Sequence, residues 1–269
     1  MRYTNYFSEE NRVFVSFGGK CSFQCLHCYT FSQNFHTEDF YSIEDIVKNL
    51  KTKNKFEIIY VSGYKENFEN PDCGIDLVES LYYEFKCHIL FTTRNVFNEK
   101  QISRISNLNK LMRKENKHLF ACVSISANNS YKKIEPNNII PSPEKRLKFV
   151  EQLYNNNIIT FLTLRPIYPD KFISTREYLT ILEKSYKYCN AVIASGISVD
   201  EYILKRLKTF PEKYVSKSKK WAYFDMEVSD VDVSKELHEI EEFCERKVPV
   251  FESSIPAINH FYNQQKINK

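Results

Sequence analysis

Apolar and polar residues alternate along this chain in two rhythms, which predict two kinds of element. Short runs rich in β-branched and aromatic residues predict strands at 13–17, 56–61, 88–93, 119–126, 158–164 and 191–197. Between these runs apolar residues recur every three or four positions, which predicts amphipathic helices at 42–51, 75–82, 102–112, 142–154 and 174–188. Strands that alternate with helices indicate right-handed βαβ units and a parallel sheet. Six units are too few to close an eight-stranded barrel, so the expected fold is α/β, a partial (βα)6 TIM-like barrel.

The pattern changes after Asp200. Residues 201–220 are rich in lysine and arginine, and residues 225–245 are rich in acidic residues. A further helix is expected around 237–243 and a last strand at 248–251. We therefore predict a core of residues 1–200 and a C-terminal α/β extension of residues 201–269 that packs on the core.

Three cysteines follow the first predicted strand within eight residues. Cys21, Cys25 and Cys28 have the spacing C-x3-C-x2-C. Cysteines this dense in one loop are usually metal ligands, because a tight loop directs several thiolates to one point. Three ligands are one short of a closed zinc site and of a fully ligated iron–sulfur cluster. The spacing therefore favours a [4Fe–4S] cluster with one open iron, and the alternative is a zinc loop completed by His27, His36 or a distant cysteine.

This loop resembles that of the radical SAM superfamily, in which the motif follows the first strand of a partial barrel. The resemblance implies that the open iron binds S-adenosylmethionine (SAM). It also implies that SAM is cleaved reductively to methionine and a 5′-deoxyadenosyl radical, which abstracts hydrogen from a substrate. Tyr29 fits the superfamily pattern, and His27 stands where an aromatic residue is common. The implied partner is an external one-electron reductant of the flavodoxin or ferredoxin type.

Later segments resemble one branch of the superfamily, the spore photoproduct lyase-like and DNA photolyase-like proteins. Thr93-Arg94 ends the third predicted strand, where that branch has Thr-Lys. The resemblance implies that Arg94 pairs with the SAM carboxylate, and the alternative is a surface salt bridge. Residues 134–136 and 142–147 also resemble the branch, and the resemblance extends over residues 12–170.

Other residues at predicted strand ends are candidates for binding SAM. Ser62-Gly63 stands where the superfamily has a small glycine-containing motif that contacts the methionine amino group, although an ordinary turn is an alternative. Ser124 and Ser126 belong to a segment that contacts SAM in the branch, and the alternative is that they fill the barrel. Arg165 is a candidate for binding SAM or an anionic substrate, and its alternative is a salt bridge to a helix.

Cys122 is the candidate catalytic residue. Side chains alternate along a strand, so Cys122, Ser124 and Ser126 lie on the same side. If that side is the barrel interior, Cys122 is a candidate hydrogen-atom donor, as a thiol is in the photoproduct lyases. The alternative is a buried structural cysteine.

The basic stretch suggests a substrate. Its cations are interleaved with four aromatic residues, Phe210, Tyr214, Trp221 and Tyr223. Cations with stacking aromatics suit single-stranded or flipped-out nucleic acid. Together with the branch resemblance, this predicts a nucleic acid or nucleotide substrate and a lyase or oxidoreductase. The alternatives are a solvated helix face, a radical SAM enzyme that modifies peptides or proteins, and a non-catalytic zinc- or cluster-bearing module that binds nucleic acid.

Composition changes this picture little. The chain has 269 residues, of which 42% are hydrophobic and 27% charged, as in globular proteins with a full core. Its net charge of +4 permits an anionic partner without demanding one. The sequence shows no apolar run of membrane-spanning length and no signal peptide, so we expect a cytoplasmic protein. The five cysteines outside the loop should stay reduced there.

Overall fold

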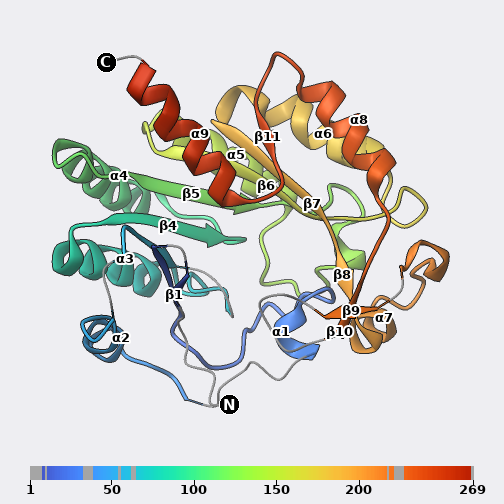
Figure 1. Ribbon diagram of the computed structural model, residues 1–269, viewed down its shortest axis with the longest axis horizontal. Coiled ribbons are helices and arrows are strands. Elements are labelled where there is room, and N and C mark those ends of the chain that lie inside the picture. Colours follow the sequence, from blue (N-terminus) through green and yellow to red (C-terminus); the bar gives the residue numbers. More distant parts are fainter. Residues whose placement is uncertain are drawn as a thin grey trace.

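A computed structural model of the chain describes residues 8–9, 11–32, 39–53, 56–61, 65–216, 218–220 and 227–267. Its centre is an eight-stranded sheet in the order β1-β2-β3-β4-β5-β6-β7-β11 (Figure 1). Neighbouring strands from β2 to β7 are parallel, and β11 is parallel to β7. The edge strand β1 is antiparallel to β2. The α/β class expected from the sequence is confirmed.

All six predicted strands belong to this sheet. Its strands are β1 Ser8–Glu9, β2 Arg12–Val15, β3 Ile58–Val61, β4 His88–Thr93, β5 Leu119–Ser124, β6 Ile159–Ile167, β7 Ala191–Gly196 and β11 Val250–Phe251. The last strand expected from the sequence is β11, and it adds a seventh parallel strand. Val250 pairs with Val192 and Phe251 with Ile193, so the C-terminal part of the chain completes the main sheet.

Helices connect the strands. They are α1 Tyr29–Ser32, α2 Ile43–Leu50, α3 Pro71–Phe85, α4 Glu99–Lys114, α5 Pro143–Asn155, α6 Thr175–Ser185, α7 Glu201–Arg206, α8 Ser234–Cys244 and α9 Ser254–Ile267. Short 3-10 turns span Tyr131–Lys133, Tyr186–Tyr188 and Glu212–Tyr214. None of the helices within the described ranges is both long and apolar enough to cross a bilayer.

The two faces of the sheet carry alternate residues of the same strands, as the period of a strand requires. Ile59 and Phe91 belong to the large core between the sheet and helices α2 to α6 and α8. Their neighbours Tyr60 and Leu90 belong to a second apolar cluster on the other face. Residues of α9, such as Ile258, complete that cluster, and α9 lies across this face of the sheet (Figure 1).

A small antiparallel sheet lies beside the cysteine loop. Its strands are β8 Ser198–Val199, β10 Glu227–Asp230 and β9 Lys219–Lys220, in the order β8-β10-β9. Helix α7 follows β8, and α7 contacts α1, which begins directly after the third cysteine (Figure 1). Residues far apart in the sequence therefore meet at this end of the molecule.

Two glycines turn the chain from β2 into the cysteine loop. Gly18 and Gly19 have φ angles of 73° and 71°, in the left-handed region. Glycine adopts this region without steric cost, whereas a side chain would make the turn strained. Gly18 also forms a bridge with Phe40, and Gly19 N donates to Asp39 O at 3.1 Å. This turn fixes where the loop starts.

Gly74 of α3 should be intolerant of a side chain. A Cβ at this position would lie 2.3 Å from Cδ1 of Phe68, whose fully buried ring packs on Phe91 and Phe97. We expect Gly74→Ala to lower the free energy of unfolding by about 1–3 kcal/mol, because overpacking outweighs the helix propensity of alanine. Urea unfolding of both proteins measures this change in the free energy of unfolding. Cys73→Ala, at the exposed neighbouring position, is the control and should change it little.

Candidate functional site

The cysteine loop leaves β2 at the carboxyl edge of the parallel sheet. Cys21 and Cys25 are buried, and Cys28 is half-buried. The thiols form a small apolar cluster with Phe23 and Ile140. In parallel α/β sheets this edge carries the binding site, because the ends of all the strands meet there. The structure therefore brings the three predicted ligands together where chemistry is expected.

Hydrogen bonds tie the loop to three segments that are distant in sequence. They run from Ser22 N to Glu69 Oε1, from Asn137 Nδ2 to Ser22 O (2.7 Å), from Leu26 N to Ile134 O (2.8 Å) and from Arg206 Nη2 to Gln24 O (3.0 Å). The loop backbone is thus held between Cys21 and Cys28, on both sides of Cys25.

The thiols of the loop lie within electrostatic range of one another. Burial is the largest cause that raises the pKa of Cys25 to about 12. The Arg94 cation opposes this rise, whereas negative charge on Cys28 and Cys21 adds to it. Burial also raises the pKa of Cys21 to about 11. Thiols in such a setting ionise when a metal binds them, because coordination replaces the proton with a positive charge.

The donor set fits an iron–sulfur cluster. Among the residues that the structure describes, no group of three or more His, Cys, Asp and Glu side chains is close enough together to hold a single metal ion. Such a site needs every sulfur within about 2.3 Å of the same ion. In a [4Fe–4S] cluster each cysteine binds its own iron, so the sulfurs stand further apart. Three neighbouring thiols beside the fixed cation of Arg94 suit that arrangement.

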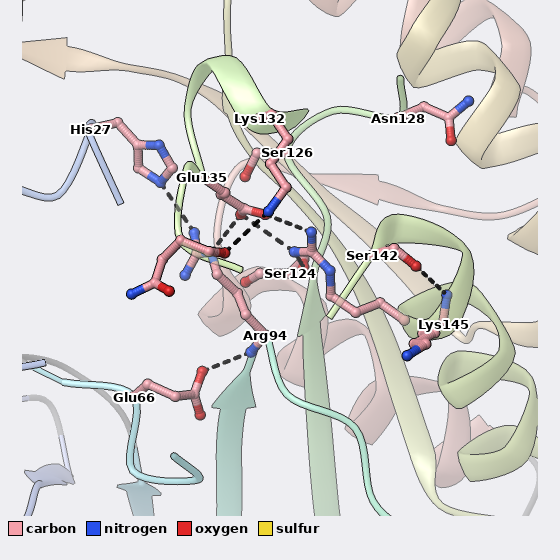
Figure 2. Close-up of polar contacts among 12 residues, drawn as sticks. His27, Glu66, Arg94, Ser124, Ser126, Asn128, Lys132, Glu135, Ser142 and Lys145 are labelled. Carbon is pink, nitrogen blue, oxygen red and sulfur yellow. Dashed lines mark hydrogen bonds and ion pairs between the residues drawn. The ribbon is translucent and has the colours of Figure 1, made fainter. Parts of the chain in front are cut away.

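Arg94, directly after β4, is fixed at the centre of a polar network (Figure 2). Its Nε donates to Glu135 Oε1 at 3.0 Å, and its Nη2 lies 3.3 Å from His27 Nε2. Its backbone N donates to Glu66 Oε2 at 2.7 Å. These contacts hold the cation beside the cysteine loop, as required for the predicted role of Arg94 toward a carboxylate.

Glu135 and Arg146 form a buried ion pair behind Arg94. Both side chains are fully buried, and Arg146 Nη2 lies 2.5 Å from Glu135 Oε2. Arg146 Nη1 also donates to Ser124 O at 2.7 Å. Burial raises the pKa of Glu135, but Arg146 and Arg94 outweigh it, so the pKa is lowered and the carboxylate stays ionised. One carboxylate therefore holds two guanidinium groups in place.

Glu66, in the loop after β3, binds the end of β4. It accepts hydrogen bonds from Thr93 Oγ1 (2.8 Å), Arg94 N (2.7 Å) and Phe68 N (3.1 Å). Burial raises the pKa of this carboxyl group, and these hydrogen bonds oppose the rise. Glu66 thus joins two strand ends. The predicted SAM-binding residues Ser62 and Gly63, just before it, lie outside the described residues.

His27 is a neutral imidazole, and one of its two ring nitrogens is hydrogen-bonded to Arg94. Burial and the neighbouring Arg94 lower the pKa of His27 to about 3. Its Nε2 accepts from Arg94, because a guanidinium group only donates. The proton is therefore on Nδ1, which is buried and has no partner in the described part of the chain. The predicted cofactor-binding role of His27 would use this N–H as a donor.

The ends of β5 and β6 bring together other predicted cofactor-binding residues. Ser126 Oγ donates to Arg165 O at 2.6 Å, and Ser124, the last residue of β5, is buried two residues earlier. Desolvation lowers the pKa of the Arg165 guanidinium, and the nearby groups of Tyr29 and Cys122 oppose this effect. Tyr29, Cys122 and Arg165 are therefore neighbours, although they come from three different elements.

Cys122 lies on the face of the sheet that α9 covers. It shares an apolar cluster with Tyr60, Phe120 and Phe161. Burial raises the pKa of Cys122 to about 12, so the group is a neutral thiol. A neutral thiol retains the S–H hydrogen that a hydrogen-atom donor needs. The catalytic role of Cys122 stays a prediction.

Several residues that build the site were not among the sequence-based candidates. They are Glu66, Glu69, Glu135, Asn137, Arg146 and Arg206. Asn137 and Arg146 belong to or adjoin the two segments that resemble the photolyase-like branch, so proximity in sequence was a usable signal. Nothing local relates Glu69 to the cysteine loop. Arg206 lies in the basic stretch, which the sequence related to a nucleic acid and not to the loop.

The basic stretch has a mixed environment. Lys208 and Lys213 are exposed. Phe210 is buried and packs on Tyr168 and Phe172, so its ring is not available to stack on a base. Trp221 and Tyr223, also predicted to stack, lie outside the described residues.

Comparison with known proteins gives likeness in structure alone. No family model matches the sequence. No curated protein matches it in sequence. Among solved structures, SuiB from Streptococcus suis matches with a TM-score of 0.58 and 9% identity over 88% of this chain and 48% of SuiB. SuiB bound to S-adenosylmethionine matches with a TM-score of 0.59 and 10% identity over 88% and 49%. The chains share a fold, and this chain spans about half the length of SuiB.

Removing the charge of Glu135 should strongly destabilise the fold. Glu135→Gln would leave the Arg146 cation buried without a counter-charge, which costs about 3–5 kcal/mol. The measurement is the free energy of urea unfolding. Glu183→Gln makes the same change in the exposed pair with Arg176 and should cost less than about 1 kcal/mol. Equal losses from the two variants would contradict the importance of the buried pair.

Proposed function

We propose that this protein is a radical SAM enzyme. The observation that carries the proposal is the set of three neighbouring thiols beside the fixed Arg94 cation, at the carboxyl edge of a parallel sheet. The spacing of Cys21, Cys25 and Cys28 supports it. So does the fold shared with SuiB, a protein that has been solved with SAM bound.

The residues of the site have separate tasks in this proposal. Cys21, Cys25 and Cys28 would hold a [4Fe–4S] cluster, which would supply the electron for the reductive cleavage of SAM. Arg94, oriented by Glu135, attracts the SAM carboxylate. The apolar residues Phe23 and Ile140 exclude water from the thiols. An external one-electron reductant of the flavodoxin or ferredoxin type restores the reduced state.

We propose a nucleic acid or a nucleotide as the substrate. The exposed cations Lys208 and Lys213 support this, since phosphates are the groups that such side chains bind. Cys122 is the candidate hydrogen-atom donor, because it is a neutral thiol on the face of the sheet where Arg165 and Tyr29 also meet.

Each loop cysteine should be required for the cluster. After anaerobic reconstitution, the wild-type protein should contain about four irons per chain and absorb light at about 400 nm. With dithionite and SAM it should release 5′-deoxyadenosine. Cys21→Ala, Cys25→Ala and Cys28→Ala should each lose most of the iron and all of this product.

Cys73→Ala is the matched control, because Cys73 is an exposed cysteine on α3. It should keep the iron, the absorbance and the product. Wild-type protein with full iron loading that releases no 5′-deoxyadenosine would refute the proposed enzyme. Colourless protein with one zinc per chain would instead favour the zinc-bearing module.

The substrate proposal predicts salt-dependent binding. Affinity for a labelled single-stranded oligonucleotide of mixed sequence should fall steeply as salt rises, because phosphate contacts release counterions. In Lys208→Gln/Lys213→Gln the slope of log affinity against log salt should decrease by about 0.7 per lost contact. Fluorescence anisotropy at several salt concentrations measures both slopes.

Lys110→Gln/Lys114→Gln removes the same charge from exposed positions of α4 and serves as the control. It should keep the wild-type slope. A flat salt response in the wild-type protein, or equal slopes in the two double variants, would argue against nucleic acid at this surface.

A further inference from the structure

Arg206, the last residue of α7, reaches the cysteine loop across 182 positions of sequence. Its Nη2 donates to Gln24 O at 3.0 Å. Its guanidinium carbon lies 5.1 Å from the ring centroid of Phe31 and 5.5 Å from that of Tyr202. Gln24 precedes Cys25, and Phe31 follows Cys28. One side chain therefore contacts the loop on both sides of two predicted ligands, where α7 lies beside α1 (Figure 1).

The residue that Arg206 holds has an unusual backbone. Gln24 has a φ angle of 50°, in the left-handed region that residues with a side chain rarely adopt. Such a conformation persists only where the surroundings enforce it. The bond from Arg206 to the carbonyl of Gln24 is a contact that can do so. The two neighbouring anchors of the loop, at Ser22 and Leu26, lie on either side of it.

Arg206 also brings positive charge to the loop. The other nearby guanidinium groups, Arg94 and Arg146, share the carboxylate of Glu135. In the described part of the chain Arg206 has a neutral carbonyl and two aromatic rings as partners and no carboxylate. With no carboxylate beside it among the described residues, the Arg206 cation acts on whatever the neighbouring loop binds.

We propose that Arg206 is a positioning residue that locks the cysteine loop and favours the reduced state of the cluster. The inference rests on the proposed function. Reduction adds one negative charge to the cluster, so a nearby cation makes reduction easier. Through Arg206, the C-terminal part of the chain would contribute to cluster binding in addition to packing on the core.

Two variants separate the effect of the Arg206 contacts with the loop from the effect of its charge. Arg206→Gln removes the charge and the contact with both rings. Arg206→Lys keeps the charge but loses the planar fork that contacts a carbonyl and stacks on rings at the same time. Lys205→Gln is the control, because it removes one charge from an exposed neighbour on the same helix.

The readouts are the midpoint potential of the cluster, from an EPR-monitored redox titration, and the rate of iron release to a chelator. Arg206→Gln should shift the midpoint to more negative potential and release iron about 10-fold faster. Arg206→Lys should keep a midpoint close to wild type and release iron faster. Lys205→Gln should match the wild-type protein in both.

Arg206→Gln protein with the wild-type midpoint and the wild-type release rate would overturn the inference. If Arg206→Gln does not fold, as judged by circular dichroism of the apoprotein, the release rate of Arg206→Lys decides, and a wild-type rate overturns the locking role. Wild-type protein that takes up no cluster would refute the proposed function itself, which is a different result from a cluster insensitive to Arg206.

Discussion

A buried carboxylate between two arginines supports the whole carboxyl edge of this sheet. Glu135 has no access to solvent, and it is stable as an anion because Arg94 and Arg146 lie against its two oxygens. The same short segment also holds the cysteine loop, through Ile134 O and Asn137 Nδ2. Four residues thus connect a buried ion pair, a fixed cation and the loop that carries the thiols. Loosening this segment would affect all three at once.

The two faces of the sheet are closed in different ways. Helices that follow the strands cover one face, as right-handed βαβ connections require. The other face is covered by α9, which comes from the end of the chain. The C-terminal part of the chain supplies three things to the core, namely the seventh parallel strand β11, the cover α9 and the contact of Arg206 with the cysteine loop. It is part of the architecture that forms the site.

The chemistry of the site follows from electrostatics at a strand edge. Buried thiols have raised pKa values and resist ionisation unless a positive group replaces their protons. Arg94 and Arg206 make this region suitable for a negatively charged group. The fold shared with SuiB at 9% and 10% identity shows that this architecture does not require identical residues at most positions. Function therefore has to be argued from the site.

The seven parallel strands, most of the helices between them and the cysteine loop were predictable from the sequence, because periodicity, capping and the spacing of three cysteines are local features. The short antiparallel strands β1, β8, β9 and β10 were not predicted. The sequence also placed Arg94 at the end of its strand. At the start of α6, Ser174 and Glu177 have the spacing that is typical of a capping box, but the Ser174 side chain makes no cap hydrogen bond. Asp170 accepts the Thr175 N–H instead, and Glu177 binds the loop at Ser130.

Three features arise only in the folded chain. Glu135 pairs with two arginines, α9 covers the second face of the sheet, and Arg206 contacts Gln24. These contacts join residues from 11 to 194 positions apart. Such contacts depend on how distant segments pack in three dimensions, and local sequence patterns carry no information about that packing.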